Sequence, residues 1–325
     1  MKSLAYWRRL ARLFYHFRKK SSQLPYLPVR LWIELTSHCN LQCLMCPNKK
    51  LKKEDKGFMD FGLYRKIIDE AAAFAFDVNL AHRGESLLYP DIIKAIRYAK
   101  GHSLFTRLHT NGSLLTSELA SSIIDSDLDR LSFSFDGYNK ENYEKIRIKG
   151  NFDQIVANII QLLEMKKSLQ RKKPRVAIEV IDFTPEETKK NVRAKNEFLS
   201  RFKGLPLDEL VVKELHNWAG ETSAEKPSSV RTICTFPWNA LIIFWDGSVL
   251  PCSQDFFGYY VLGNVKNSSL KEIWNNEKMI SMRKKLAAKD VADIATCVRC
   301  DRLRRKNIFG VPKEYLWKFI SKRMP

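Results

Sequence analysis

Six short apolar runs typical of buried strands alternate with segments of helical periodicity. The runs span residues 29–35, 77–81, 104–110, 130–135, 175–181 and 209–215. Strands that alternate with helices pair in parallel, because each helix returns the chain to the start of the sheet. Six strand–helix units are fewer than the eight that close a TIM barrel. We therefore expect an α/β fold built on an open, partial (β/α)6 TIM barrel.

The pattern changes after residue 215. Residues 216–230 contain Gly, Pro and Ser and predict a linker. Apolar runs then flank Asp246-Gly247, which suits a tight hairpin turn, and Ser269 with Glu272 forms a capping box that begins a helix. We expect five parts: a basic amphipathic N-terminal segment (1–28), the partial barrel (29–215), the linker (216–230), a small β-hairpin/helix module (231–300) and a basic tail (301–325).

Three cysteines stand in one short loop directly after the first predicted strand. Cys39, Cys43 and Cys46 form the pattern Cys-x3-Cys-x2-Cys. A structural zinc ion normally has four protein ligands, whereas three thiolates leave one coordination position of a metal centre open. A zinc site and a chance cluster are the ordinary alternatives. The loop follows a strand, where the chemistry of barrel folds occurs.

The segments that follow the next strands complete a family pattern. With the cysteine loop, they resemble the radical S-adenosylmethionine (SAM) superfamily over about residues 29–300. The resemblance implies a [4Fe–4S] cluster held by Cys39, Cys43 and Cys46, SAM at the fourth iron, and an external one-electron reductant of flavodoxin or ferredoxin type. It also implies reductive cleavage of SAM to a 5′-deoxyadenosyl radical. The segments are "HRGESLLYPDI" (82–92), "HTNGSLLT" (109–116), "SFSFDGYNKENYEKIRIKG" (132–150) and "GSVLPC" (247–252).

The same resemblance assigns residues to SAM. Gly84 and Glu85 hold its methionine amino group, and Asn111, Ser134 and Arg147 hold its ribose or carboxylate. An arginine suits a carboxylate because its fork binds both oxygens. Ordinary structural or solvent-exposed roles are the alternatives for these residues.

Two positions depart from the family pattern. Met45 stands where an aromatic residue often precedes the third cysteine. The glycine-rich motif, commonly Gly-Gly-Glu-Pro, reads Arg83-Gly84-Glu85-Ser86. The resemblance therefore assigns no role to Arg83 or Ser86.

The other four cysteines are Cys234, Cys252, Cys297 and Cys300. Four thiolates with no open position suit a fully ligated [4Fe–4S] cluster, with structural zinc as the alternative. The set resembles the C-terminal auxiliary-cluster module of SPASM type, in its shorter twitch form with one extra cluster. The layout of one SAM cluster and one auxiliary cluster is most similar to dehydrogenases that oxidise an amino-cyclitol alcohol, the 2-deoxy-scyllo-inosamine type.

An auxiliary cluster is useful in an oxidation. A carbinol carbon that has lost a hydrogen atom must still lose a proton and an electron to become a ketone. We therefore expect a radical SAM oxidoreductase that oxidises an alcohol of a carbohydrate-like substrate, with the auxiliary cluster as electron acceptor. Asp255 and His216 are the candidate bases, each with a structural role as its alternative.

Further functions stay open. Auxiliary clusters also serve maturases that modify peptides, although only 28 residues precede the first predicted strand, too few for a peptide-binding domain. Epimerisation and C–C or C–S bond formation are further radical outcomes. A non-catalytic iron–sulfur or zinc protein is the alternative from another class.

The net charge of +20 is concentrated at the two ends. Residues 1–30 carry eight Lys or Arg and no acid, and residues 301–325 carry eight against two acids, so the ends supply 14 of the 20 charges. The N-terminal segment predicts a basic amphipathic helix on an anionic membrane, with packing on the barrel as the alternative. Basic ends also suit a nucleotide- or lipid-linked sugar as the small-molecule substrate.

Apolar runs long enough to span a membrane are absent, and arginines interrupt any signal-peptide core. We therefore expect a cytoplasmic protein, with peripheral contact at the inner face of the membrane through the N-terminal helix. No RNA-binding motif accompanies the positive charge, so no nucleic-acid partner is expected.

Overall fold

The computed structural model describes residues 4–182, 192–222, 232–304, 307–308 and 311–312. Residues 223–230 of the predicted linker, residue 231 and most of the predicted basic tail lie outside the described residues. The chain divides into two compact units. The barrel unit comprises Leu31–Leu215 and Phe244–Gly247, and the terminal unit comprises Met1–Arg30, His216–Ile243 and Ser248–Pro325. The N-terminal segment therefore belongs with the C-terminal module, although the whole barrel separates them in sequence.

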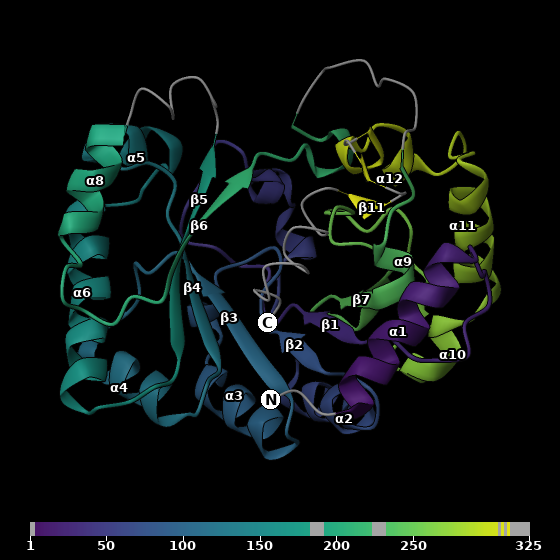
Figure 1. Ribbon diagram of the computed structural model, residues 1–325, viewed down its shortest axis with the longest axis horizontal. Coiled ribbons are helices and arrows are strands. Elements are labelled where there is room, and N and C mark those ends of the chain that lie inside the picture. Colours follow the sequence, from purple (N-terminus) through teal and green to yellow (C-terminus); the bar gives the residue numbers. More distant parts are fainter. Residues whose placement is uncertain (1–3, 183–191, 223–231, 305–306, 309–310, 313–325) are drawn as a thin grey trace. The chain divides into compact units, whose positions relative to one another are not determined.

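Six strands form the sheet of the barrel unit in the order β1-β2-β3-β4-β5-β6 (Figure 1). From β2 to β6, each strand pairs in parallel with the next strand in sequence. The predicted α/β partial barrel is confirmed. The strands are β1 (Arg30–Ile33), β2 (Asp77–Asn79), β3 (Phe105–Thr110), β4 (Arg130–Ser134), β5 (Arg175–Asp182) and β6 (Glu209–Glu214).

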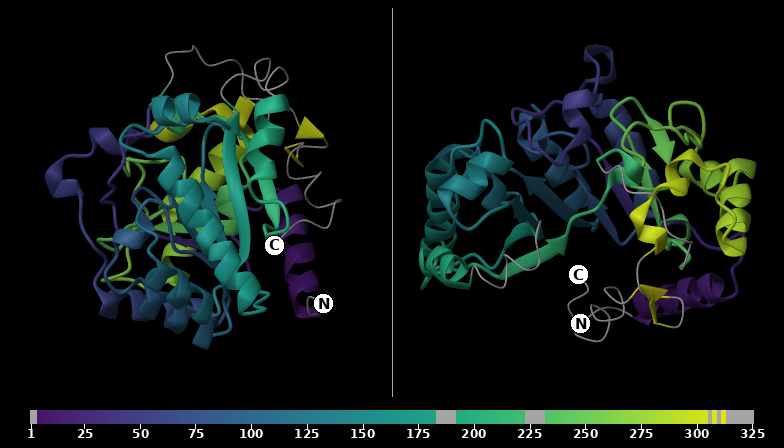
Figure 2. Two further views of the ribbon diagram at one scale, coloured as in Figure 1. Left: turned by 90° about the vertical axis from the view of Figure 1, so that its left-hand side faces the viewer. Right: turned by 90° about the horizontal axis from the view of Figure 1, so that it is seen from above.

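Helices connect these strands and cover one face of their sheet (Figures 1 and 2). Asp60, Thr116, Asn139 and Asn151 each cap a helix, because their side chains accept the backbone N–H three residues further on. The α-helices are α2 (Phe61–Ala72), α3 (Ile92–Gly101), α4 (Ser117–Asp125), α5 (Lys140–Ile146), α6 (Phe152–Ser168) and α8 (Val192–Ser200). The 3-10 helices are η1 (Pro47–Lys50), η2 (Lys53–Asp55) and η3 (Ser86–Leu88).

The sheet of the barrel unit has an apolar and a polar face. Phe135, directly after β4, packs on Phe198 of α8 with ring centroids 4.9 Å apart, so its face is the one that the helices cover. Because side chains alternate along a strand, Ser134 faces the other way. Glu179 on β5 is the register partner of Ser134, so it lies on the same face. His109 on β3 pairs with Ser132, two residues before Ser134, and therefore lies on this face as well. The polar side chains therefore project from the face opposite the helices.

A small antiparallel sheet organises the terminal unit. β7 pairs with β8, and β8 pairs with β9, as the predicted hairpin at Asp246-Gly247 requires. The predicted capping box of Ser269 and Glu272 is present at α10. The elements are α1 (Leu4–Arg18), η4 (Trp218–Gly220), α9 (Phe236–Asn239), β7 (Ala240–Ile243), β8 (Ser248–Leu250), β9 (Gly263–Asn264), α10 (Leu270–Trp274), α11 (Glu277–Ala288), α12 (Ala295–Val298), η5 (Asp301–Arg304), β10 (Asn307–Ile308) and β11 (Val311–Pro312).

Hydrogen bonds hold the N-terminal segment to the rest of the terminal unit. Phe17 of α1 is buried against Trp238, whose indole N–H donates to the carbonyl of Ser21 at 2.9 Å. Arg283 of α11 is fully buried, and a buried guanidinium needs acceptors. It donates to three backbone carbonyls, those of Ser22, Pro237 and Trp274. Within the described residues, no helix has the length and apolar character needed to cross a bilayer.

Candidate active site

The loop after β1 brings three thiols into one partly buried site. Cys39, Cys43 and Cys46 are free, and the backbone N–H of Cys46 donates to the carbonyl of Cys43 at 3.1 Å. Two backbone hydrogen bonds of 3.1 and 2.9 Å join the loop to residues 146–148, at the end of α5. The pKa of Cys39 is raised to about 11 and that of Cys46 to about 12, mainly by burial. The neighbouring thiols contribute to both increases. The three thiols therefore share one partly buried loop after β1.

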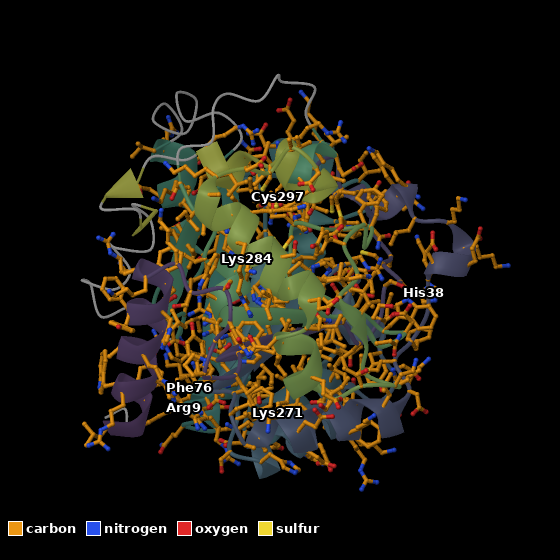
Figure 3. The ribbon with its side chains drawn as sticks, turned by 90° about the vertical axis from the view of Figure 1, so that its right-hand side faces the viewer. Arg9, His38, Phe76, Lys271, Lys284 and Cys297 are labelled. Atoms are coloured by element: carbon orange, nitrogen blue, oxygen red, sulfur yellow. The ribbon has the colours of Figure 1, made fainter. Side chains whose placement is uncertain are left out.

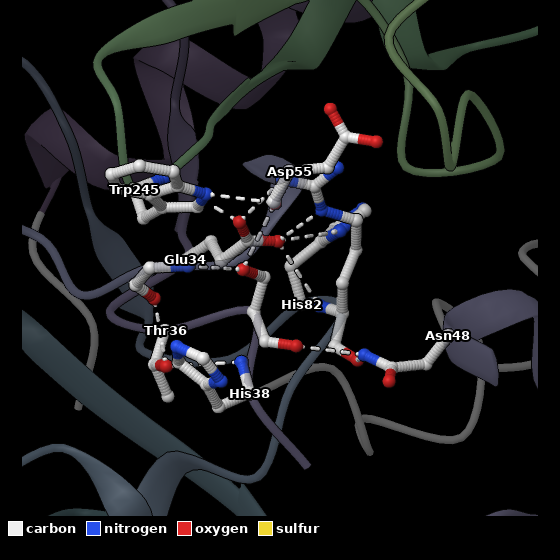
Figure 4. A network of polar contacts seen from close by, with 10 residues as sticks. Glu34, Thr36, His38, Asn48, Asp55, His82 and Trp245 are labelled. Atoms are coloured by element: carbon white, nitrogen blue, oxygen red, sulfur yellow. Dashed lines mark hydrogen bonds and ion pairs between the residues drawn. The ribbon is translucent and has the colours of Figure 1, made fainter. Parts of the chain in front are cut away.

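A buried ion pair joins the end of β1 to the loop after β2. Arg83 donates to both oxygens of Glu34, from Nε to Oε2 at 2.6 Å and from Nη2 to Oε1 at 2.7 Å (Figure 4). Burial alone would raise the pKa of Glu34, but the Arg83 guanidinium outweighs it and lowers the pKa to about 2. The guanidinium also lies 3.5 Å from the ring centre of Phe244. Arg83 thus has a structural role, which the family pattern did not supply.

Residues 83–86 lie directly against the cysteine loop and the residues that flank it. Nδ2 of Asn48 donates to the carbonyl of Arg83 at 2.8 Å (Figure 4). The N–H of Glu85 donates to the carbonyl of His38 at 2.8 Å. A Cβ at Gly84 would lie 2.3 Å from a backbone carbonyl oxygen of residue 36. Only glycine allows so close an approach.

Glu85 is buried and accepts three hydrogen bonds. Its Oε1 accepts the hydroxyl of Thr110 at 2.6 Å and the N–H of Leu87 at 3.0 Å, and its Oε2 accepts the N–H of Asn111 at 2.7 Å. Burial raises the pKa of Glu85 in spite of these bonds. The solvent-exposed alternative for Glu85 is therefore wrong, and its carboxylate positions the end of β3.

Asn111 closes a ring of hydrogen bonds with the cysteine loop. Its Nδ2 donates to Oδ1 of Asn40 at 2.9 Å, and Nδ2 of Asn40 donates to Oγ of Ser113 at 2.8 Å. The hydroxyl of Ser113 donates back to Oδ1 of Asn111 at 2.6 Å. Asn40 and Ser113 were not predicted from the sequence, although each is a polar neighbour of a motif residue.

Arg147 is buried beside a ligand candidate. Its Nη1 lies 3.8 Å from Sγ of Cys43, and its Nη2 donates to Asp136 at 2.5 Å. Burial alone would lower the pKa of Arg147, but Asp136 outweighs it and raises the pKa, so the guanidinium stays charged. Nε of Arg147 is buried and has no hydrogen-bond partner in the described part of the chain. A buried donor of this kind fits an anionic group of a bound cofactor.

The polar face of the sheet holds a charged cluster that was not predicted from the sequence. Nδ1 of His109 lies 3.4 Å from Oε2 of Glu179, and Lys213 on β6 forms an ion pair with the same oxygen. Burial alone would raise the pKa of Glu179, but His109 and Lys213 outweigh it and hold the pKa well below its usual value. Ser134 stands beside Glu179 in the register. Oδ1 of Asn79, on the same face, is buried without a partner among the described residues.

Four thiols gather in the terminal unit. Cys234 precedes α9, Cys252 follows β8, Cys297 lies in α12 and Cys300 follows it. A hydrogen bond joins Cys234 to Cys252 and raises the pKa of Cys252, while burial raises the pKa of Cys300 to about 12, with Cys234 adding to it. Oε1 of Gln254 is buried with no partner in the described residues, and its N–H donates to Sγ of Cys252 at 3.3 Å. No three His, Cys, Asp or Glu side chains of the described residues converge as ligands of a single metal ion.

Known families match both cysteine sites. Residues 33–171 match the radical SAM superfamily, and residues 234–301 match SPASM, an iron–sulfur cluster-binding domain. The chain carries a radical SAM domain followed by a SPASM domain. The first contains the three-thiol loop, and the second contains the four thiols. Their cofactors are a [4Fe–4S] cluster with SAM and an auxiliary iron–sulfur cluster, which confirms the cofactor prediction.

The similar proteins differ in their named functions. A cofactor-modifying protein of a tungsten-containing aldehyde ferredoxin oxidoreductase from Pyrococcus furiosus is 25% identical over 76% of this chain and 81% of its own. The SAM-dependent 2-deoxy-scyllo-inosamine dehydrogenase of Niallia circulans is 21% identical over 83% of this chain and 92% of its own. The crystal structure of Streptococcus suis SuiB bound to precursor peptide SuiA shares the fold, with a TM-score of 0.62 and 14% identity over 91% of this chain and 74% of that one.

Both predicted bases lie in the terminal unit. Asp255 is buried next to the SPASM cysteines, and its two oxygens accept the N–H groups of Tyr259 at 2.9 Å and Tyr260 at 2.8 Å. His216 is exposed to solvent on part of its surface, with its ring centre 4.4 Å from that of Trp218. Asp255 therefore shapes a loop beside the thiols, and a catalytic role for either residue stays a prediction.

Proposed function

We propose that the protein uses a SAM-derived radical to oxidise an alcohol of a carbohydrate-like substrate to a ketone. The presence of a four-thiol site in the same chain as the three-thiol loop carries this proposal. Four protein ligands leave no open position, so a cluster held there exchanges electrons and not ligands. Oxidation of an alcohol by a radical releases an electron that must be accepted. The similarity to a dehydrogenase over 92% of that enzyme's length supports the same reaction.

The cysteines divide between two cofactors. We assign Cys39, Cys43 and Cys46 to the SAM cluster. When bound, this cluster and SAM supply the radical that abstracts a hydrogen atom, and the auxiliary cluster supplies an acceptor for the electron. The auxiliary ligands are Cys234, Cys252, Cys297 and Cys300. One such cluster corresponds to the twitch form of the SPASM domain.

The polar residues of the barrel unit hold SAM. Gly84 and Glu85 lie against the cysteine loop, and Asn111 is hydrogen-bonded to that loop through Asn40. Arg147 keeps its charge and offers Nε to a carboxylate. Ser134 supplies a hydroxyl on the polar face. Among the described residues, no group forms a hydrogen bond with this hydroxyl. Together these groups satisfy the ribose and the amino-acid end of SAM.

His109 joins Asp255 and His216 as a candidate for the base that takes the hydroxyl proton. Its Nδ1 is oriented by Glu179, and its Nε2 has no partner among the described residues. An imidazole held by a carboxylate, with its second nitrogen available, is the geometry of a general base. Asp255 already uses both oxygens. The contacts therefore favour His109.

The substrate class follows from the polar face and the basic chain ends. Asn79, His109, Glu179 and Lys213 offer donors and acceptors suited to hydroxyl groups, and a nucleotide- or lipid-linked sugar would also use positive charge. An external one-electron reductant of flavodoxin or ferredoxin type supplies the electron for SAM cleavage. Modification of a peptide is the second candidate reaction, because SuiB, which was crystallised with a precursor peptide, shares the fold. Epimerisation and C–C bond formation would use the same radical.

Isotope transfer tests the proposal. Anaerobically reconstituted protein would be given SAM, dithionite and a panel of cyclitols and nucleotide sugars that carry deuterium at the carbinol carbons. Deuterium in 5′-deoxyadenosine, with one ketone formed per 5′-deoxyadenosine, is the expected result. Deuterium transfer with inversion of the carbinol would establish epimerisation instead. Modification of a co-expressed peptide, with no turnover of the sugars, would establish the maturase.

A further inference from the structure

Helix α1 has two apolar faces, and the terminal unit covers one of them. On the inner face Phe17 is buried, and Leu10 and Leu13 are half-buried. The outer face keeps four large side chains exposed over half or more of their surface: Leu4 (66%), Trp7 (51%), Phe14 (55%) and Tyr15 (56%). An apolar stripe of this size on a helix already anchored through its other side indicates a binding surface.

Positive charge borders the outer stripe. Leu4, Trp7 and Phe14 follow helical spacing and lie above one another along α1. Arg8 and Arg12 are exposed and occupy the adjoining stripe. Residues 4–18 contain no acidic side chain. The exposed surface therefore combines aromatic rings with unneutralised cations.

We propose that the outer face of α1 binds the surface of an anionic lipid bilayer. The helix is about 22 Å long and would lie in the plane of the interface. Trp7 and Tyr15 would sit at the headgroup level, where amphipathic rings accumulate in membrane proteins. Arg8 and Arg12 would meet lipid phosphates while their aliphatic stems follow the apolar stripe. None of these residues belongs to the cysteine sites, so the proposal does not depend on the reaction.

Charge argues against two further occupants of this face. A second copy of the chain would bring the same arginines to an isologous contact, where like charges repel. Residues 313–325 carry four Lys or Arg against one acid, so they repel the helix as well. An anionic bilayer satisfies both the apolar and the charged parts of the surface.

Vesicle co-sedimentation of the full chain tests the proposal. We expect binding to phosphatidylcholine vesicles that contain phosphatidylglycerol, little binding to pure phosphatidylcholine, and weaker binding at high salt. Removal of two charges in Arg8→Gln/Arg12→Gln should weaken the affinity about thirtyfold, since each basic residue near the surface contributes about 1 kcal/mol. Trp7→Ser/Phe14→Ser should abolish binding that persists at high salt.

The matched control removes two charges elsewhere in the same unit. Lys271 on α10 and Lys284 on α11 are exposed (Figure 3), so Lys271→Gln/Lys284→Gln changes the net charge equally and should retain the affinity of the wild type. Circular dichroism and iron content would verify folding of each variant. Equal weakening by the control, no binding to the anionic vesicles, or a dimer that the α1 substitutions dissociate would each overturn the proposal.

Discussion

The buried pair of Glu34 and Arg83 supports the cysteine loop, and its removal has a calculable cost. The pKa of Glu34 falls from 4.5 to about 2 in the folded protein. Each tenfold change in proton affinity is worth about 1.4 kcal/mol, so the native environment favours the carboxylate by about 3 kcal/mol. Breaking a buried ion pair by removing one partner typically costs about 3–5 kcal/mol. Glu34→Gln should therefore lower the free energy of unfolding by about 3–5 kcal/mol.

The pH dependence of this contribution has a definite sign. Because the folded pKa of Glu34 is depressed, its contribution is complete above the unfolded pKa of about 4.5 and is lost as the pH falls towards 2. Urea unfolding of the cluster-free protein, followed by circular dichroism under reducing conditions, would measure both effects. Wild type should lose more stability than Glu34→Gln between pH 5 and pH 3, where about half of the effect lies.

A double-mutant cycle separates the ion pair from unrelated effects. Glu34→Gln leaves the Arg83 guanidinium buried without its counter-charge, whereas Glu34→Gln/Arg83→Met removes both charges. The double variant should therefore lose less free energy of unfolding than Glu34→Gln and Arg83→Met lose together, by at least about 2 kcal/mol. The partly exposed Glu209, which pairs with Arg130 and Arg175, is the control, and Glu209→Gln should lower the free energy of unfolding by under about 1 kcal/mol. A cost below about 1 kcal/mol for Glu34→Gln would refute the reasoning.

Three further substitutions test the site. Gly84→Ala would place a Cβ 2.3 Å from a backbone oxygen, so iron incorporation at the three-thiol loop should fall; normal iron content and SAM binding would contradict this. Arg147→Met should weaken SAM binding roughly 10–100-fold, measured by equilibrium dialysis of the reconstituted protein, and Arg147→Lys should recover part of the affinity. His109→Gln should leave deuterium transfer into 5′-deoxyadenosine intact while ketone formation falls roughly 100-fold; equal loss of both would assign His109 to binding instead.

The fold and the two cysteine clusters were readable from sequence because each follows a local rule. Strand and helix periodicity located all six barrel strands, and Asp246-Gly247 located the hairpin. The cysteine spacing predicted the two iron–sulfur sites, which the radical SAM and SPASM matches support. Such signals lie within a few residues of one another, so no tertiary contact is needed to read them.

The supporting contacts were not readable, because they join distant segments. The ion pair of Glu34 with Arg83 spans 49 residues, and that of His109 with Glu179 spans two strand crossings. Only the parallel register brings these side chains to one face. Arg83 looked like a departure from the glycine-rich motif, and the fold explains it as the partner of a buried carboxylate.

Iron content after anaerobic reconstitution tests the central claim that one chain holds two separately ligated clusters. Wild type should bind about eight iron atoms per chain, and both Cys39→Ala/Cys43→Ala/Cys46→Ala and Cys297→Ala/Cys300→Ala should bind about four. Only the second variant should still form 5′-deoxyadenosine from SAM and dithionite. Iron content that is unchanged by Cys297→Ala/Cys300→Ala would contradict the auxiliary cluster and the oxidation built on it.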